Sequence, residues 1–145
     1  MISRAEFAKM ISLTFGIENY GETAFNDVSG NEWYAEYISA LNGAGIMLGD
    51  ENGNVNPDAD ITRQDMAVML YRTSDYCKIA LDKINSRAVF NDRAEISDYA
   101  ETAIEELQQA GIINGNGQGS FMPKAFATRA EAAKMICCLA DLAEK

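Results

Sequence analysis

The chain repeats itself, and this repetition limits the possible folds more than any other feature of the sequence. When the sequence is aligned with itself at a shift of 66 residues, identical residues coincide across two long segments. The coincident residues include Ile38 with Ile104, Leu41 with Leu107, Gly45 with Gly111, Pro57 with Pro123 and Arg63 with Arg129. We therefore expect one domain over residues 1–145, made of a half repeat at 1–20 and two full repeats at 25–84 and 90–145.

The sequence of each full repeat predicts a helix, a loop and a second helix. Apolar residues at helical spacing predict a first helix from about Asn31 to Ala44, followed by Gly45 at a position typical of a helix end. The corresponding helix of the next repeat is expected from about Ser97 to Ala110. Short linkers are expected near Tyr20–Glu22 and Asn85–Arg87. The sequence therefore predicts an all-α fold.

The second helices begin at Thr62 and Thr128. The first of them is expected to continue to about Ile84, because no Gly or Pro interrupts it, and the last to near Ala143. The half repeat contributes one more helix of the same type, which begins after Ser3.

The two loops, 49–57 and 115–123, are rich in Gly and Asn, and we expect Val55 and Phe121 to anchor them on the core. The acidic segment from Asp50 to Asn54 has the composition of a calcium loop. Its glycine and the residue at its twelfth position, Ile61, do not fit an EF-hand. Turn chemistry accounts better for this segment, and we predict no metal site.

A Ser/Thr-Arg-x-acid pattern opens the second helix of each repeat. A hydroxyl residue followed three positions later by a carboxylate predicts a capping box, in which each side chain bonds the other residue's backbone amide. The three pairs are Ser3 with Glu6, Thr62 with Asp65, and Thr128 with Glu131.

The helix caps do not explain the arginine inside this pattern, which is Arg4, Arg63 or Arg129. A cation at a helix N-terminus is unfavourable by about 0.3–1 kcal/mol. Arginine beside free helix amides and a Gly-rich loop suits a small anionic ligand. An internal bridge, for instance to Asp27 or Asp92 of the Phe-Asn-Asp turns, suits it equally well. Both interpretations stay open.

Trp33 and Tyr99 occupy corresponding positions at the starts of the first helices. An aromatic residue beside a polar loop can stack on a sugar ring. An aromatic residue on an apolar helix face is more often part of the core, and we favour the core for both residues.

Composition excludes several classes of function. A net charge of −10 argues against a general nucleic-acid or anionic-membrane surface. The chain has no histidine, its three cysteines lack metal-site spacing, and no apolar run is long enough for a bilayer. We expect no enzyme and no cofactor. Met1 leads straight into an amphipathic helix, so an exported protein would contain this chain as one part of a longer whole.

The ordered pattern Phe-x-Asp, Trp, Ile-x-x-Leu-x-x-x-Gly-Ile, Gly, Pro and Thr-Arg-x-Glu resembles the S-layer homology domain. The resemblance implies repeats arranged as a pseudo-threefold helical spindle around a central bundle. It also implies non-covalent anchoring at the bacterial cell surface, through a secondary cell-wall polysaccharide that carries a pyruvate ketal. By resemblance Arg4, Arg63 and Arg129 would bind this ligand, and Gly49 and Gly115 would let the backbone approach the sugar.

The chain departs from the family pattern at several positions. The half repeat lacks its front portion, so a pocket that depends on it would be absent or completed by a second copy, and Arg63 and Arg129 are expected to be better sites than Arg4. Gln64-Asp65 replaces Ala-Glu, Tyr99 replaces Trp, and Ala127 replaces Ile. The alternative function is a helical protein-interaction or self-assembly domain of a surface protein, with the arginines in internal salt bridges.

Overall fold

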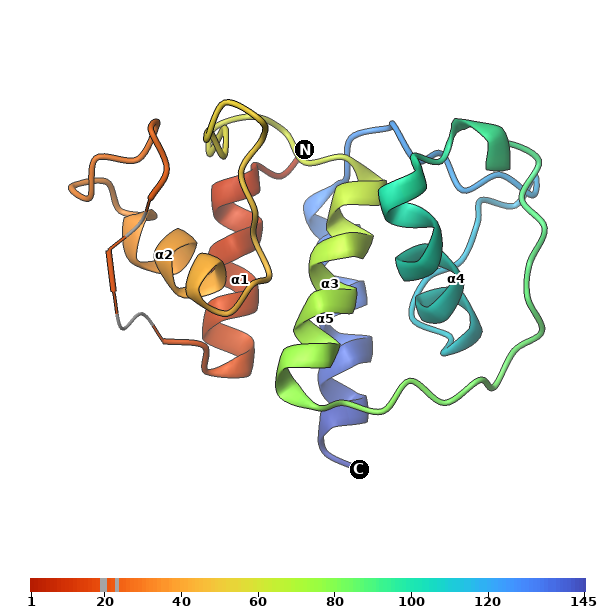
Figure 1. Ribbon diagram of the computed structural model, residues 1–145. Helices are drawn as coiled ribbons and strands as arrows, with labels where there is room; N and C mark the ends of the chain where they lie inside the picture. The colour runs from red at the N-terminus through yellow and green to blue at the C-terminus, as the bar shows by residue number, and fades with distance from the viewer. Residues whose placement is uncertain (19–20, 23) are drawn as a thin grey trace.

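The computed structural model describes residues 1–18, 21–22 and 24–145, which form five α-helices without a named strand (Figure 1). The helices are α1 (Arg4–Phe15), α2 (Ala35–Gly43), α3 (Arg63–Cys77), α4 (Glu101–Gln109) and α5 (Arg129–Ala143). Two short 3-10 helices, Arg93–Glu95 and Asp98–Ala100, precede α4. The all-α prediction is confirmed, whereas the linker predicted at Tyr20 lies outside the described residues.

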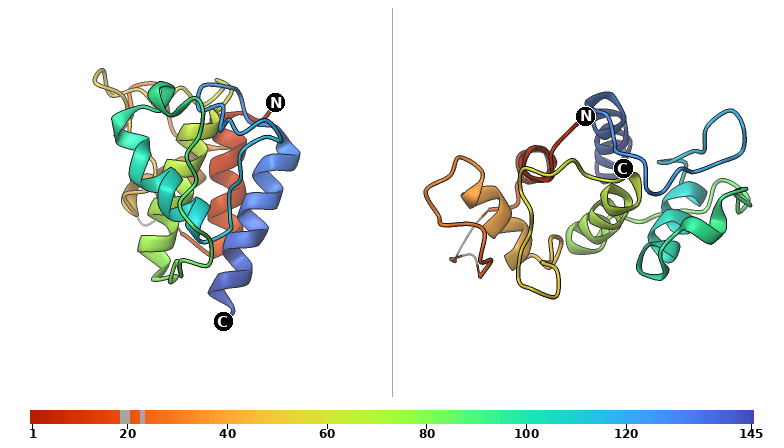
Figure 2. Two further views of the ribbon diagram at one scale, coloured as in Figure 1. Left: turned by 90° about the vertical axis from the view of Figure 1, so that its right-hand side faces the viewer. Right: turned by 90° about the horizontal axis from the view of Figure 1, so that it is seen from above.

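The three long helices α1, α3 and α5 form a central bundle, in which each contacts the other two. Their N-termini lie at the same end (Figures 1 and 2). The shorter α2 packs against α1, and α4 packs against α3. Within the described part of the chain, no corresponding short helix packs against α5. The full threefold spindle therefore stays an expectation from the family resemblance.

A ring of backbone hydrogen bonds joins the starts of the three central helices. The amide of Ile2 donates to the carbonyl of Ala127 at 3.1 Å, Ile61 donates to Ile2 at 3.1 Å, and Ala127 donates to Ile61 at 2.9 Å. All three residues are fully buried. The ring brings the three Ser/Thr-Arg-x-acid segments together at one end of the bundle.

The core is built from the apolar faces that the repeat pattern predicts. Ile38 and Leu41 of α2 are fully buried, and so is Leu107 of α4. Val55 and Phe121 are also buried, which confirms that they anchor the two loops.

The short helices end as predicted but begin later. Gly45 and Gly111 have positive φ, and the amide of the residue that follows each bonds back to a carbonyl of the last helical turn, as in a Schellman motif. The segment 31–34 forms a bend and a turn before α2, and the Glu32 carboxylate accepts hydrogen bonds from the amides of Ser29 and Gly30.

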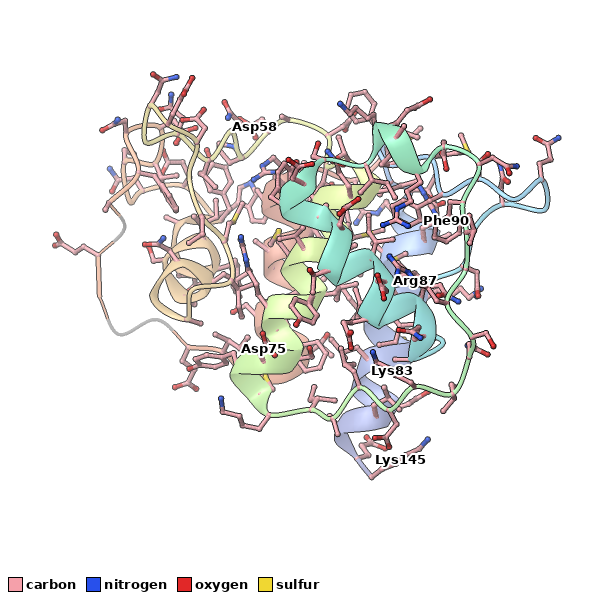
Figure 3. All side chains as sticks on the ribbon, turned by 45° about the vertical axis from the view of Figure 1, so that its right-hand side comes forward. Asp58, Asp75, Lys83, Arg87, Phe90 and Lys145 are labelled. Carbon is pink, nitrogen blue, oxygen red and sulfur yellow. The ribbon has the colours of Figure 1, made fainter. Side chains whose placement is uncertain are left out.

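The prediction that α3 continues to Ile84 is wrong. The helix ends at Cys77, where Lys78 adopts a left-handed conformation with φ of 57°. The chain then runs beside α4, held by bonds from the amides of Ile84 and Asn85 to the Gln109 carbonyl. Lys83 and Arg87, which belong to this segment, form ion pairs with carboxylates of α4 (Figure 3). Tertiary contacts end α3, so no Gly or Pro marks the place in the sequence.

Candidate functional site

The hydroxyl residues of the recurring pattern cap the three central helices as predicted. Ser3 and Thr128 form complete capping boxes with Glu6 and Glu131. Thr62 accepts a hydrogen bond from the Asp65 amide, but the return bond from the Asp65 carboxylate, which the capping-box prediction requires, is not made. The Asp65 side chain is one methylene shorter than glutamate and bonds other partners.

The three arginines form ion pairs with these same carboxylates, each in the following repeat. Arg4 Nη1 lies 3.1 Å from Asp65 Oδ2, Arg63 Nη1 pairs with Glu131 Oε1, and Arg129 Nη1 lies 2.6 Å from Glu6 Oε1. The pairs follow one another around the bundle and close into a ring. An internal bridge is therefore present, but Asp27 and Asp92 are wrong as its partners.

Arg4 and Arg63 are also held by the loop of the following repeat. Arg4 Nε donates to the Val55 carbonyl at 2.8 Å, and Arg63 Nε donates to the Phe121 carbonyl at 2.9 Å. Their side chains are only 18% and 11% exposed. A guanidinium has five N–H donors, so donors remain on both arginines beyond these bonds.

Arg129 differs from the other two arginines, because its side chain is 65% exposed. Among the described residues, its side chain bonds Glu6 and no loop carbonyl of the kind that holds Arg4 and Arg63. Arg4 and Arg63 are therefore the enclosed arginines and Arg129 is the open one, whereas the sequence favoured Arg63 and Arg129 over Arg4 as sites.

The first helical amides of α1 and α3 are not free, contrary to the sequence-based expectation. The amides of Arg4 and Ala5 donate to the carbonyls of Ala59 and Pro57, both at 2.9 Å. Those of Arg63 and Gln64 donate in the same way to loop 115–126. These amides hold the loops in place, so an anion at these sites would meet the arginine rather than the helix end.

Asp27 and Asp92 also hold the loops. Asp27 accepts hydrogen bonds from the amides of Val55 and Asn56, and Asp92 accepts them from Phe121 and Met122, all between 2.7 and 3.1 Å. Neither aspartate lines the clefts beside the arginines.

Gly49 and Gly115 line those clefts and have a packing role as well. A Cβ atom on Gly49 would lie 2.8 Å from the Phe25 ring, and one on Gly115 would lie 2.9 Å from both the Phe90 ring and the Ser120 carbonyl. Close packing against the Phe-Asn-Asp turn therefore requires glycine at both positions.

The assignment of Trp33 and Tyr99 to the core is wrong, because they are 54% and 59% exposed. The Lys9 Nζ atom lies 5.6 Å from the centre of a Trp33 ring, a cation–π arrangement. Tyr99 Oη donates to Asp65 at 2.6 Å and accepts from Gln64 at 3.0 Å. Burial and the bond to Asp65 raise the pKa of Tyr99 to about 12.

Two clefts lie beside the enclosed arginines, and we name each after its arginine. The Arg4 cleft has a volume of about 560 Å³ and is bounded by loop 49–60, Asp65, Arg72 and Tyr99. The Arg63 cleft has a volume of about 450 Å³ and is bounded by loop 114–126, Glu131 and Lys134. The sequence interpretation missed Arg72 and Lys134, which helical spacing from Asp65 and Glu131 could have indicated.

Two of the carboxylates in the ring, Glu6 and Glu131, have a lowered pKa. Hydrogen bonds from Ser3, followed by Arg129, lower the pKa of Glu6. For Glu131 burial acts in the opposite direction, but hydrogen bonds from Thr128 and the charge of Arg63 lower its pKa overall. Each enclosed arginine pairs with one carboxylate and keeps further N–H donors.

The Asp50 carboxylate closes a turn by accepting hydrogen bonds from the amides of Asn52 and Asn54, both at 2.9 Å. Among the described residues, no group of three or more His, Cys, Asp or Glu side chains could hold a metal ion. Cys77 and Cys138 are half-buried, and Cys137 is exposed. None of the described helices combines the length and apolar character needed to cross a membrane.

Both full repeats match the model of one known protein family. The family model of the S-layer homology domain matches residues 24–67 and 89–133, more than half of the chain. This family is a non-catalytic anchoring module, and its relatives indicate a cell-surface, cell-wall-associated location.

Relatives include surface proteins and enzymes. The chain is 37% identical over 136 residues to exoglucanase XynX of Acetivibrio thermocellus, 39% over 131 residues to the surface-layer 125 kDa protein of Lysinibacillus sphaericus, and 30% over 130 residues to S-layer protein EA1 of Bacillus anthracis. These matches cover 93%, 88% and 90% of this chain, but only 12%, 11% and 14% of the relatives. On the family match, the chain belongs to the S-layer homology domain family.

Proposed function

We propose that this domain anchors a longer surface protein by binding an anionic, pyruvylated cell-wall polysaccharide in the Arg4 and Arg63 clefts. One observation carries the proposal: each arginine lines a cleft, its side chain is only 18% (Arg4) or 11% (Arg63) exposed, and some of its N–H donors are not used by the bonds described above. A pyruvate ketal carries one carboxylate, which a guanidinium can bind through charge-assisted hydrogen bonds.

The arrangement favours binding because the arginines are already fixed. Arg4 is held by one carboxylate and the Val55 carbonyl, and Arg63 by one carboxylate and the carbonyls of Phe121 and Asn114, so little side-chain freedom remains to be lost on binding. Two clefts that engage one polymer gain affinity through effective concentration.

Purified wall polysaccharide, before and after chemical removal of the ketal, tests the proposal without any protein variant. The domain should co-sediment with the native polymer and lose this binding when the ketal is removed. Equal binding to both polymers would exclude the ketal as the recognised group.

The closed ring of ion pairs favours a second candidate, a self-assembly domain whose arginines serve the fold. In this case the exposed Arg129 and Glu6 mark a face that is covered by a further helix–loop unit, supplied by a second copy. Sedimentation analysis should then show a dimer at micromolar concentration, and replacing Arg63 should reduce stability without changing wall binding.

A further inference from the structure

The two clefts have the same architecture but different charges at corresponding positions. Asp65 corresponds to Glu131, so the carboxylate that pairs with the arginine is kept. Three other positions that line both clefts differ in charge, each toward less negative charge in the Arg63 cleft: Asp50 corresponds to Asn116, Asp60 to Phe126, and Val68 to Lys134. Arg72 lines only the Arg4 cleft, and its counterpart is the uncharged Cys138.

The fold does not require the charge at Asp50. Asn116 accepts hydrogen bonds from the amides of Gln118 and Ser120 at 2.9 and 3.0 Å, as Asp50 does from Asn52 and Asn54. Aspartate and asparagine therefore close the same turn through Oδ1. They differ by one unit of charge at the cleft and in one long contact: Asp50 Oδ2 accepts from Asn56 Nδ2 at 3.4 Å, whereas Asn116 Nδ2 donates to Met122 Sδ at 3.5 Å.

The charges that line the clefts sum to opposite signs. In the Arg4 cleft, two arginines face three aspartates, which leaves one net negative charge. In the Arg63 cleft, Arg63 and Lys134 face only Glu131, which leaves one net positive charge. Beyond the cleft walls, loop 49–60 carries two further carboxylates, Glu51 and Asp58, and no cation, whereas loop 115–126 carries Lys124 and no carboxylate.

The Arg63 cleft also has the more apolar wall. Phe126 is 52% exposed and Met122 is 46% exposed, and both line this cleft. At the corresponding positions the Arg4 cleft has Asp60 and Asn56. An exposed aromatic ring beside two cations suits a sugar that carries an apolar methyl group and a carboxylate on the same ketal.

We infer that the Arg63 cleft selects the carboxylate-bearing sugar, with Lys134 as the specificity-determining residue, and that the Arg4 cleft binds the same anion more weakly. This inference rests on the proposed function. One unit charge at about 7 Å in water changes the affinity for a monovalent anion about threefold at low salt. The difference of two charges between the cleft walls therefore corresponds to about a tenfold difference in affinity.

Amide shifts measure both clefts in one titration. The probe is the methyl glycoside of an N-acetylhexosamine with one pyruvate ketal, and the reporters are the amides of Gly115 and Phe121 for the Arg63 cleft and of Gly49 and Val55 for the Arg4 cleft. At low salt the Arg63 reporters should saturate at about tenfold lower concentration of the probe, and added salt should reduce the difference, because it screens exposed charges.

The chain provides matched variants. Lys134→Gln and Asn116→Asp should each weaken the Arg63 cleft about threefold, and Asp50→Asn should strengthen the Arg4 cleft about threefold. Because Asp50 and Asn116 close the same turn, exchange between them leaves the fold unchanged, and Lys134 is exposed on α5. The amide spectrum of each free variant checks this.

The outcomes separate the two proposals. Equal saturation in both clefts, or a Lys134→Gln variant with unchanged affinity, would overturn the inference and leave ketal binding standing. If neither cleft responds to the probe, the proposed function and this inference both fail.

Discussion

The Tyr99 hydroxyl donates a 2.6 Å hydrogen bond to the Asp65 carboxylate, which also pairs with Arg4. Gln64 donates to the same hydroxyl and bonds both the amide and the side chain of Ser97. Three departures from the family pattern, Gln64, Asp65 and Tyr99, therefore contact one another. The shorter Asp65 leaves the capping box open, and Tyr99 uses the carboxylate that this releases.

Replacing Tyr99 with phenylalanine removes the hydroxyl and keeps the ring. The free energy of unfolding, measured by urea denaturation, should fall by about 1 kcal/mol, because one charge-assisted and one neutral hydrogen bond are lost. Tyr76→Phe is the control, since Tyr76 is also half exposed. If both variants lose the same stability, the contact with Asp65 contributes nothing.

Tyr99 also predicts a loss of stability at alkaline pH. Its pKa is about 12 in the folded protein against an ordinary value of 10.0, so the folded state holds the proton more tightly. Its contribution is complete below pH 10 and is lost as pH rises toward 12. The readout is the difference in unfolding free energy between wild type and Tyr99→Phe, which removes every contribution that the two proteins share. This difference should shrink across the interval, and a constant difference would contradict the assignment.

The three arginines should differ in their effect on stability. Arg63→Ala leaves Glu131 and the Phe121 carbonyl without their partner in a mostly buried position, and should cost about 2 kcal/mol or more. Arg129→Ala removes an exposed pair and should change the unfolding free energy by less than about 0.5 kcal/mol. Thermal and urea unfolding of both variants measures this, and equal losses would contradict the difference in enclosure.

The loop glycines test how closely loop 115–123 packs against the Phe-Asn-Asp turn. Gly115→Ala places a Cβ atom 2.9 Å from both the Phe90 ring and a backbone carbonyl, and should destabilise the domain by about 1–3 kcal/mol. Gly117→Ala in the same loop is the control, because nothing lies within 4 Å of its Cβ position. If the Gly115→Ala and Gly117→Ala variants are equally stable, the loop moves to make room for the Cβ atom without a loss of stability, and the prediction is contradicted.

The features that the sequence predicted correctly are those that depend on local interactions. The caps at Ser3 and Thr128, the helix stops at Gly45 and Gly111 and the loop anchors Val55 and Phe121 all follow from short-range patterns. These features depend on residues a few positions apart, so one chain segment is enough to recognise them.

Short-range patterns could not predict the carboxylate partners of the arginines, because each partner lies in a different repeat from its arginine. Arg4 and Asp65 are 61 residues apart, and Arg129 and Glu6 are 123 residues apart. The same cause explains the early end of α3 and the exposure of Trp33, which both depend on how neighbouring repeats pack. A periodic sequence shows that corresponding residues are equivalent, but not which repeat completes each site.

The proposed polysaccharide binding depends on the enclosed arginines, and calorimetric titration with a short pyruvylated wall oligosaccharide tests it most directly. Arg63→Gln should weaken binding at least tenfold, because a charge-assisted hydrogen bond contributes about 1.5–3 kcal/mol. Arg129→Gln should bind as wild type does, since Arg129 lines neither cleft. A folded Arg63→Gln variant that binds with wild-type affinity would contradict the account.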